Sequence, residues 1–100
     1  MGNVCLDEVE LPGTIKTVGD SAFEGCESLF RLTFGSGTTT IGSCVFKKCT
    51  NLQELTIPAS VTSIGRNLFQ DGSDFVMIFC KDGSAAQTYA EANELMFVIE

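Results

Sequence analysis

Residues 39–65 read TTIGSCVFKKCTNLQELTIPASVTSIG, and they establish the fold class of the chain. Its pair Ile41-Gly42 returns 23 residues later as Ile64-Gly65, and the same step continues toward both ends of the chain. The best-kept columns are Gly19, Gly42 and Gly65; Phe23, Phe46 and Phe69; Val18, Ile41 and Ile64; Leu29, Leu52 and Phe75; Leu32, Leu55 and Ile78; and Phe34, Ile57 and Cys80. A fixed repeat of roughly 20 to 50 residues predicts a solenoid, whose units bury their apolar side by stacking on one another.

Each repeat contains two extended segments. Leu55 and Ile57 alternate with the polar Glu54 and Thr56, as in a strand with one buried face. Pro58 then ends the strand, because proline cannot donate to a ladder of hydrogen bonds. A second short extended segment precedes each glycine of the repeat, at residues 15–18, 38–41 and 61–64. Strands of successive coils should lie parallel, about 4.8 Å apart.

A turn that contains the phenylalanine completes the repeat. Ala22, Phe23 and Cys26 have the spacing of one helical face. Ser21 followed by Glu24 is typical of a capping box, so we expect about one turn of helix at this place. The glycine before it suits a turn with unusual backbone angles, or a close approach of two backbones.

The two ends of the chain depart from the period. Within a single domain, 1–100, the expected units are a partial repeat at 3–12, repeats at about 13–35, 36–58 and 59–81, and a cap at 82–100. Ser84 with Gln87 predicts a helix that runs to about Asn93, and residues 96–99 predict a final strand. Because an uncapped first coil exposes its core, we expect the chain to be the C-terminal piece of a longer protein. The alternative is a short protein whose open N-terminal end is closed by self-association.

The charge of the chain narrows the classes of partner. Its 100 residues carry 6 Lys and Arg against 13 Asp and Glu, a net charge of −7. This balance opposes binding to nucleic acid and to anionic lipid, which both depend on cationic side chains. No apolar run reaches the roughly 18 residues of a spanning helix, so we expect no membrane insertion in this segment. An acidic surplus is also how small domains stay soluble.

The residues that carry catalytic chemistry are sparse. The chain has no histidine, which removes Cys-His and Ser-His pairs and histidine-ligated metals. Glu8 and Glu10 share a strand face, but a solvated face explains them equally well. Residues 71–74 and 82–84 lack the alternating ligands and terminal glutamate of an EF-hand, and turn chemistry accounts for them. We therefore predict no enzyme, no catalytic residue, no metal and no cofactor.

Five cysteines need separate treatment. Cys26, Cys49 and Cys80 fall in apolar columns, where free cysteine acts as a small buried group. Cys44 falls in a polar column, and we expect it to be partly exposed and the first candidate for intermolecular oxidation. The state of Cys5, near the open end, is left undecided. A zinc site would need Cys-x-x-Cys pairs, for which Cys44 and Cys49 are a weak substitute.

The quoted stretch resembles the BspA-type leucine-rich repeat, also called the Treponema-type repeat, with the pattern I-G-x-x-A-F-x-x-C-x-x-L-x-x-L-x-L-P-x-x-V-x-x. Residues 18–35 and 41–58 fit it closely, and 64–81 fits with substitutions. The departures are Gly35, Thr38, Gly72 and Lys81. The resemblance implies an α/β solenoid, a right-handed coil with parallel strands on one face. Short strands and helical turns form the other face, and a helix–strand cap closes the C-terminal end. It also implies thiols in the cysteine column and a cell-surface or secreted location, because proteins similar to this family are typically surface or secreted proteins, several of them adhesins.

The outward positions of the main strands form the candidate binding site. In chain order they are Glu8, Glu10, Arg31, Thr33, Glu54, Thr56, Met77 and Phe79. Along the stack this face passes from acidic, through mixed polar, to apolar. Exposed apolar residues rimmed by polar ones often mark a contact site. The alternative is that the C-terminal cap covers Met77 and Phe79, with Tyr89 or Phe97 packing nearby.

Three functions are compatible with these features. The first is a non-enzymatic protein-interaction or adhesion module that binds a protein partner, such as a host matrix protein or another surface protein, through the strand face. The second is a structural spacer that holds an N-terminal functional region away from the cell surface. The third is an enzyme or metal protein that uses the thiols. We favour the first, since no catalytic constellation is evident and the family resemblance supports it.

Overall fold

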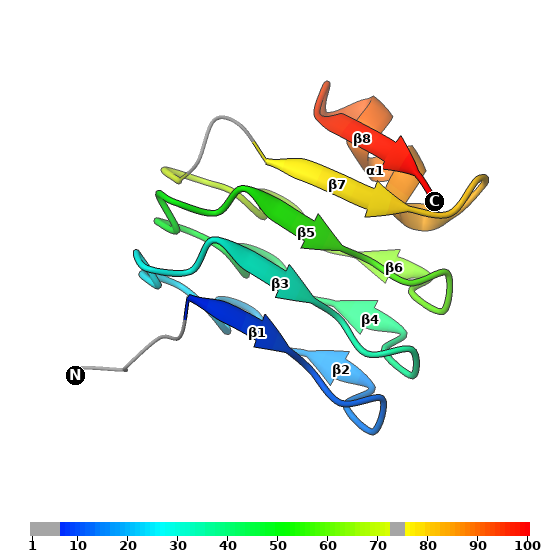
Figure 1. Cartoon of the computed structure of the whole chain (residues 1–100), viewed down its shortest axis with the longest axis horizontal. Coiled ribbons are helices and arrows are strands. Elements are labelled where there is room, and N and C mark those ends of the chain that lie inside the picture. The colour runs from blue at the N-terminus through cyan, green and yellow to red at the C-terminus, as the bar shows by residue number, and fades with distance from the viewer. Residues whose placement is uncertain (1–6, 73–75) are drawn as a thin grey trace.

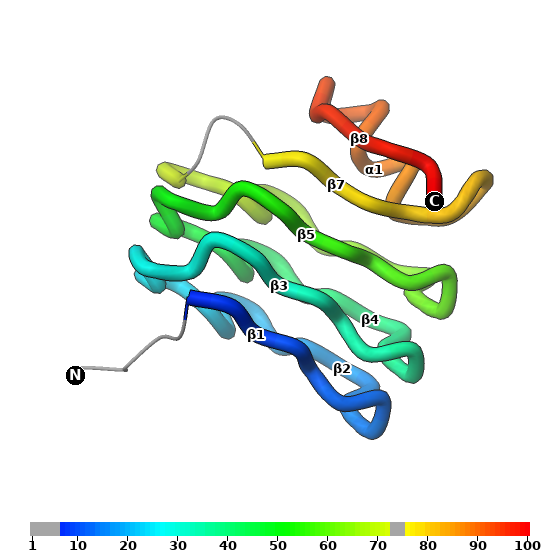
Figure 2. The backbone as a smooth tube through the Cα atoms, viewed as in Figure 1, coloured from blue at the N-terminus to red at the C-terminus, as the bar shows by residue number. Residues whose placement is uncertain are grey.

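A computed structural model describes residues 7–72 and 76–100 of the chain. The chain winds into a parallel β-solenoid with a short C-terminal helix (Figure 1). The backbone trace shows successive coils running alongside one another and turning back at the same two sides (Figure 2). The expected solenoid is therefore confirmed. Predictions that concern Cys5, Leu6 and Phe75, and part of the 71–74 loop, lie outside the described residues.

One strand from each coil joins a five-stranded parallel sheet. Its order is β1 (Glu8–Glu10), β3 (Arg31–Thr33), β5 (Glu54–Thr56), β7 (Met77–Cys80) and β8 (Met96–Ile99). A second parallel sheet contains the short strands β2 (Thr17–Val18), β4 (Thr40–Ile41) and β6 (Ser63–Ile64). Between repeats, the register joins residues 23 apart, as in Leu32 beside Leu55. The sequence period is thus the circumference of one coil.

The segments that carry the phenylalanines are turns, so the prediction of a helical turn is wrong. The Cys49 N–H donates to the Phe46 carbonyl at 3.0 Å, a three-residue bond that closes a tight turn. The Phe46 N–H instead donates to the Leu68 carbonyl of the next coil at 2.9 Å. A helix would use this N–H internally. A carbonyl on a neighbouring coil is available only where coils stack, and here the bond to it replaces the hydrogen bond that a helix would form.

Two columns of left-handed backbone explain how these turns close. Ser21, Cys44 and Asn67 have φ values of 57°, 57° and 56°. Gly25, Lys48 and Asp71 form the second column, with φ values of 80°, 64° and 55°. The proposed capping serine of the first repeat, Ser21, therefore lies at a turn and not at a helix start. Residues other than glycine adopt this conformation at a cost, which the surrounding ladder of hydrogen bonds offsets.

Two members of the glycine column, Gly42 and Gly65, are required by close approach and not by unusual angles. Gly65 has no positive φ. A Cβ on Gly65 would lie only 2.5 Å from the carbonyl carbon of Gly42. Adjacent coils therefore touch backbone to backbone at this column, and a larger residue would push them apart.

A stack of aromatic rings runs through the core. The ring of Phe46 lies 5.8 Å from that of Phe23 and 5.8 Å from that of Phe69, nearly parallel to both. Phe34 meets it edge-on at 6.1 Å. Phe46 is fully buried, together with Leu52 and the other inward aliphatic residues. Thr38, which departs from the aliphatic pattern, is also buried, and its hydroxyl donates to the Ile15 carbonyl at 2.8 Å.

The C-terminal cap forms close to the predicted boundaries. Helix α1 (Ala85–Ala92) begins after Ser84, whose hydroxyl accepts the Gln87 N–H at 3.2 Å. Asn93, the expected last helical residue, is the C-cap. The Tyr89 hydroxyl accepts the N–H of buried Leu68 at 3.3 Å. This bond ties helix α1 to the last phenylalanine turn.

Candidate functional site

The eight predicted residues lie in two rows on the outer face of the five-stranded sheet. One row contains Glu8, Arg31, Glu54 and Met77, and the other contains Glu10, Thr33, Thr56 and Phe79. All eight are exposed or half-buried, whereas Leu32, Leu55 and Ile78 between the rows have no exposed surface. We call these eight residues the strand face. Whether it binds a partner stays a prediction.

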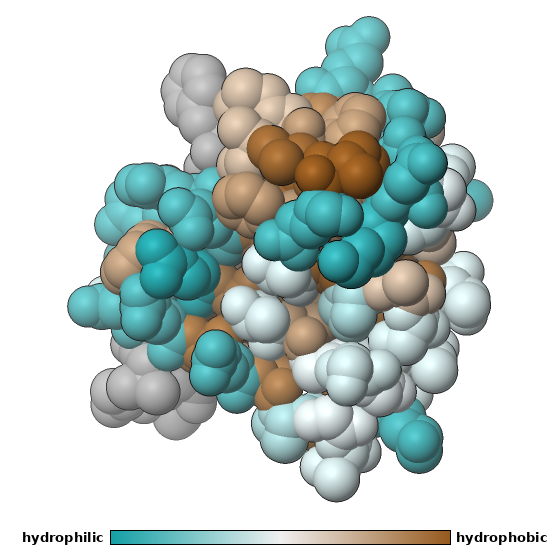
Figure 3. All heavy atoms as spheres, turned by 45° about the vertical axis from the view of Figure 1, so that its right-hand side comes forward, coloured by the Kyte–Doolittle hydropathy of each residue, from teal (hydrophilic) through white to brown (hydrophobic). Residues whose placement is uncertain are grey.

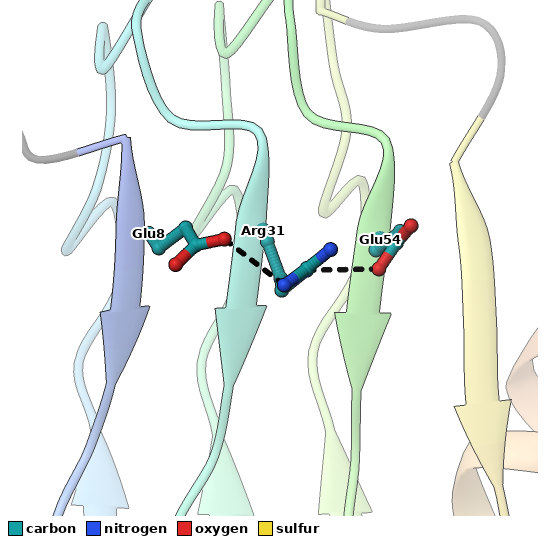
Figure 4. A network of polar contacts seen from close by, with 3 residues as sticks. All are labelled: Glu8, Arg31 and Glu54. Carbon is teal, nitrogen blue, oxygen red and sulfur yellow. Dashed lines mark hydrogen bonds and ion pairs between the residues drawn. The ribbon is translucent and has the colours of Figure 1, made fainter.

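A charged network occupies the acidic part of the strand face. Arg31 Nη1 lies 2.9 Å from Glu8 Oε2, and Arg31 Nε lies 2.9 Å from Glu54 Oε1 (Figure 4). The guanidinium also lies 5.6 Å from the centre of the Phe30 ring. About half of each charged side chain is exposed. Solvated pairs of this kind contribute only about 0–1 kcal/mol each, so the network orients Arg31 more than it stabilises the fold.

The apolar end of the strand face is extended by the cap and not covered by it. Met77 and Phe79 are half-buried, and their register partners on β8 are Met96 and Val98. Phe97 is the partner of inward Ile78 and packs against the core, as does Tyr89. The expected covering by Tyr89 or Phe97 is therefore wrong. Parallel pairing of β8 with β7 places Met96 and Val98 on the outer face, which widens the apolar area.

Two hollows follow the strand face. The larger has a volume of about 520 Å³ and is lined by Thr50, Asn51, Gln53, Glu54, Met77, Phe79 and Met96. The smaller, about 310 Å³, is lined by Glu8, Val9, Glu10, Arg31 and Thr33. Sequence reasoning missed Met96, because the uniformly apolar run 96–99 does not reveal which strand it joins or which of its faces is outward.

The thiols show why enzymatic use of cysteine is not supported. Burial raises the pKa of Cys49, although a backbone hydrogen bond to Cys26 opposes the rise. Burial also raises the pKa of Cys80, against a hydrogen bond to Ser84. A raised pKa keeps the thiol protonated and weakly nucleophilic. Cys44 is free and half-buried, with its sulfur 3.5 Å from Gln70 Oε1, as expected for a partly exposed cysteine.

The expectation of a free thiol at Cys26 is wrong. Cys26 is buried and disulfide-bonded. The repeat pattern assigns Cys26 to the same column as Cys49, which is free. A disulfide depends on the distance and direction between two particular side chains, which a column of equivalent positions does not specify.

Within residues 7–72 and 76–100, no three His, Cys, Asp or Glu side chains cluster as a metal site would require. No helix in these ranges has the length and apolar character needed to cross a membrane.

The stacked parallel strands and their 23-residue register define a solenoid of the leucine-rich repeat class. A family described as the BspA type leucine rich repeat region, in 6 copies, matches residues 1–92. The chain belongs to this family. Repeats of the family suggest a protein-interaction module, are typically non-enzymatic, and are found in surface-associated proteins.

A solved structure is also similar to this chain. It is described as "The Crystal structure of Pneumococcal vaccine antigen PcpA", with 35% sequence identity and a TM-score of 0.69. The match covers 78% of this chain and 20% of that one, so the chain corresponds to about a fifth of the antigen's length. The curated proteins contain no match to the chain.

Proposed function

We propose that this chain is a non-enzymatic protein-interaction module of a cell-surface or secreted protein, and that it binds a protein partner through the strand face. The observation that carries the proposal is the pair of hollows on that face. Seven of the eight outward residues, all except Thr56, line one or the other. A partner laid across the strands would meet acidic, mixed and apolar surface in turn, and these surfaces are free of the constraints of core packing.

Adhesion to host matrix or to another surface protein is the form of this function that the family supports. The similar solved structure is that of a pneumococcal vaccine antigen. A spacer function would require only the stack itself. The apolar residues Met77 and Phe79 favour binding over a spacer, because a spacer gains nothing from leaving them half-exposed.

The test is capture of the purified chain by immobilised matrix and serum proteins, measured by surface plasmon resonance. The double variant Arg31→Ala/Glu54→Ala should lose at least tenfold in affinity for whichever protein binds. Because their ion pairs are solvated, the variant should lose no more than about 1–2 kcal/mol of folding stability. The matched control is Lys16→Ala/Ser63→Ala, which alters exposed residues near the second sheet. Equal loss in both variants, or binding unchanged in the first, would contradict binding through the strand face.

A further inference from the structure

The large apolar residues that remain exposed in the described chain all lie in one strand. They are Met96, Val98 and Ile99, which are 48%, 42% and 41% exposed. All three belong to β8, the last strand in the order of the five-stranded sheet. In Figure 3 a brown apolar patch, bordered by teal hydrophilic residues, occupies the upper part of the molecule, where Figure 1 places β8 and α1.

Among the residues that the structure describes, no strand pairs with the outer edge of β8. The Glu100 N–H donates to the Cys80 carbonyl of β7 at 2.9 Å. In a strand, the N–H and C=O of successive residues point alternately to its two sides. The backbone groups of Val98 therefore also face β7, whereas those of Phe97 and Ile99 face away from it. Exposed strand edges readily pair with another extended chain, and proteins usually protect them with charges or proline. β8 contains neither, whereas β1 at the opposite edge carries Glu8 and Glu10.

Charge decides what kind of chain fits this edge. The cap, 82–100, carries Asp82, Glu91, Glu94 and Glu100 and contains no lysine or arginine. Glu94, in the turn before β8, and Glu100, directly after it, flank the strand at its two ends. A second copy would add the same acidic side chains to the same edge. A segment with basic residues at its ends would instead place opposite charges against both carboxylates.

We propose that the open edge of β8 binds an extended, basic segment of a partner protein, which adds one strand to the five-stranded sheet. This inference rests on the proposed function, since it names the chemistry of the partner. Every second side chain of the added strand lies beside Met96 or Val98. We expect these partner side chains to be apolar, because they continue the apolar area that begins at Met77 and Phe79. Its terminal lysines or arginines face Glu94 and Glu100 in either strand direction.

The test uses fluorescence anisotropy with a labelled basic peptide, Lys-Thr-Val-Thr-Val-Thr-Lys, and with an acidic control peptide in which glutamate replaces both lysines. We expect the basic peptide to bind at least tenfold more tightly, and its affinity to fall as salt is raised. Ile99→Pro removes the N–H that faces the open edge without removing a bond to β7, and should weaken binding about five- to tenfold. The matched control is Ile99→Val, which keeps this N–H and should bind within twofold of the parent chain.

Four outcomes measured without the captured protein would overturn this inference. They are no binding of the basic peptide up to millimolar concentration, equal binding of both peptides, equal binding by Ile99→Pro and Ile99→Val, or a concentration-dependent dimer that Ile99→Pro abolishes in light scattering. The last would assign the edge to a second copy of the chain. If Arg31→Ala/Glu54→Ala lost binding to the captured protein while Ile99→Pro kept it, the proposed function of the strand face would stand and only the proposal for the β8 edge would be rejected.

Discussion

Phe46→Ala tests the core of the solenoid directly. Phe46 is fully buried, stacks at 5.8 Å on a ring above and a ring below, and meets Phe34 edge-on at 6.1 Å. Truncation of a buried phenylalanine costs about 3–5 kcal/mol, which includes the cavity that remains. Each aromatic pair contributes about 0.5–1.5 kcal/mol beyond its buried area. With three such pairs, we expect a loss in the upper half of that range, about 4 kcal/mol.

The assay is urea unfolding followed by far-UV circular dichroism. With a slope of about 1–3 kcal/mol per molar urea, the midpoint should fall by at least about 1 M. Phe69→Ala should cost less, about 2 kcal/mol, because Phe69 is partly exposed and stacks on Phe46 from one side. Lys47→Ala, the neighbouring control, should cost under about 0.5 kcal/mol. Equal losses for Phe46→Ala and Lys47→Ala would refute the assignment of the phenylalanine column to the core.

Three further predictions concern stability. Tyr89→Phe should cost about 1–2 kcal/mol in urea unfolding, since it leaves the buried Leu68 N–H without its acceptor; an unchanged midpoint would exclude this role for Tyr89. Lys48→Gly should stabilise the chain by up to about 1 kcal/mol because φ is 64° there, while Lys47→Gly should destabilise it; the same sign for both would contradict the turn geometry. Burial raises the pKa of Cys49, so above the usual thiol pKa of about 8.5 the native thiol keeps a proton that the unfolded chain releases. The free energy of unfolding should therefore fall as pH rises above that value. Cys49→Ala should flatten that fall between pH 8 and 10.

Much of the strand face, the candidate binding site, could be predicted from the sequence, but its extension onto β8 could not. Alternation in a strand places Glu54 and Thr56 outward wherever the neighbouring strand lies, so the rows of the strand face follow from local pattern. The pairing of β8 with β7 is different. Residues 96–99 are apolar throughout, and such a run does not reveal which of its faces is buried or which strand it joins. Only the assembled sheet shows that Met96 and Val98 extend the strand face.

The period, the parallel register and the aromatic stack all follow from the residue pattern, because residues that recur every 23 positions must meet when each coil closes on the next. The remaining features depend on the folded chain. The tertiary fold made the phenylalanine segments turns, because the N–H groups of Phe23 and Phe46 bond to carbonyls on the adjacent coil, which local helix signals cannot anticipate. It also bonded Cys26 into a disulfide while Cys49, in the same column, stayed free. Both outcomes depend on contacts between particular coils. A repeat pattern treats all coils as equivalent, but in the folded chain each coil has different neighbours.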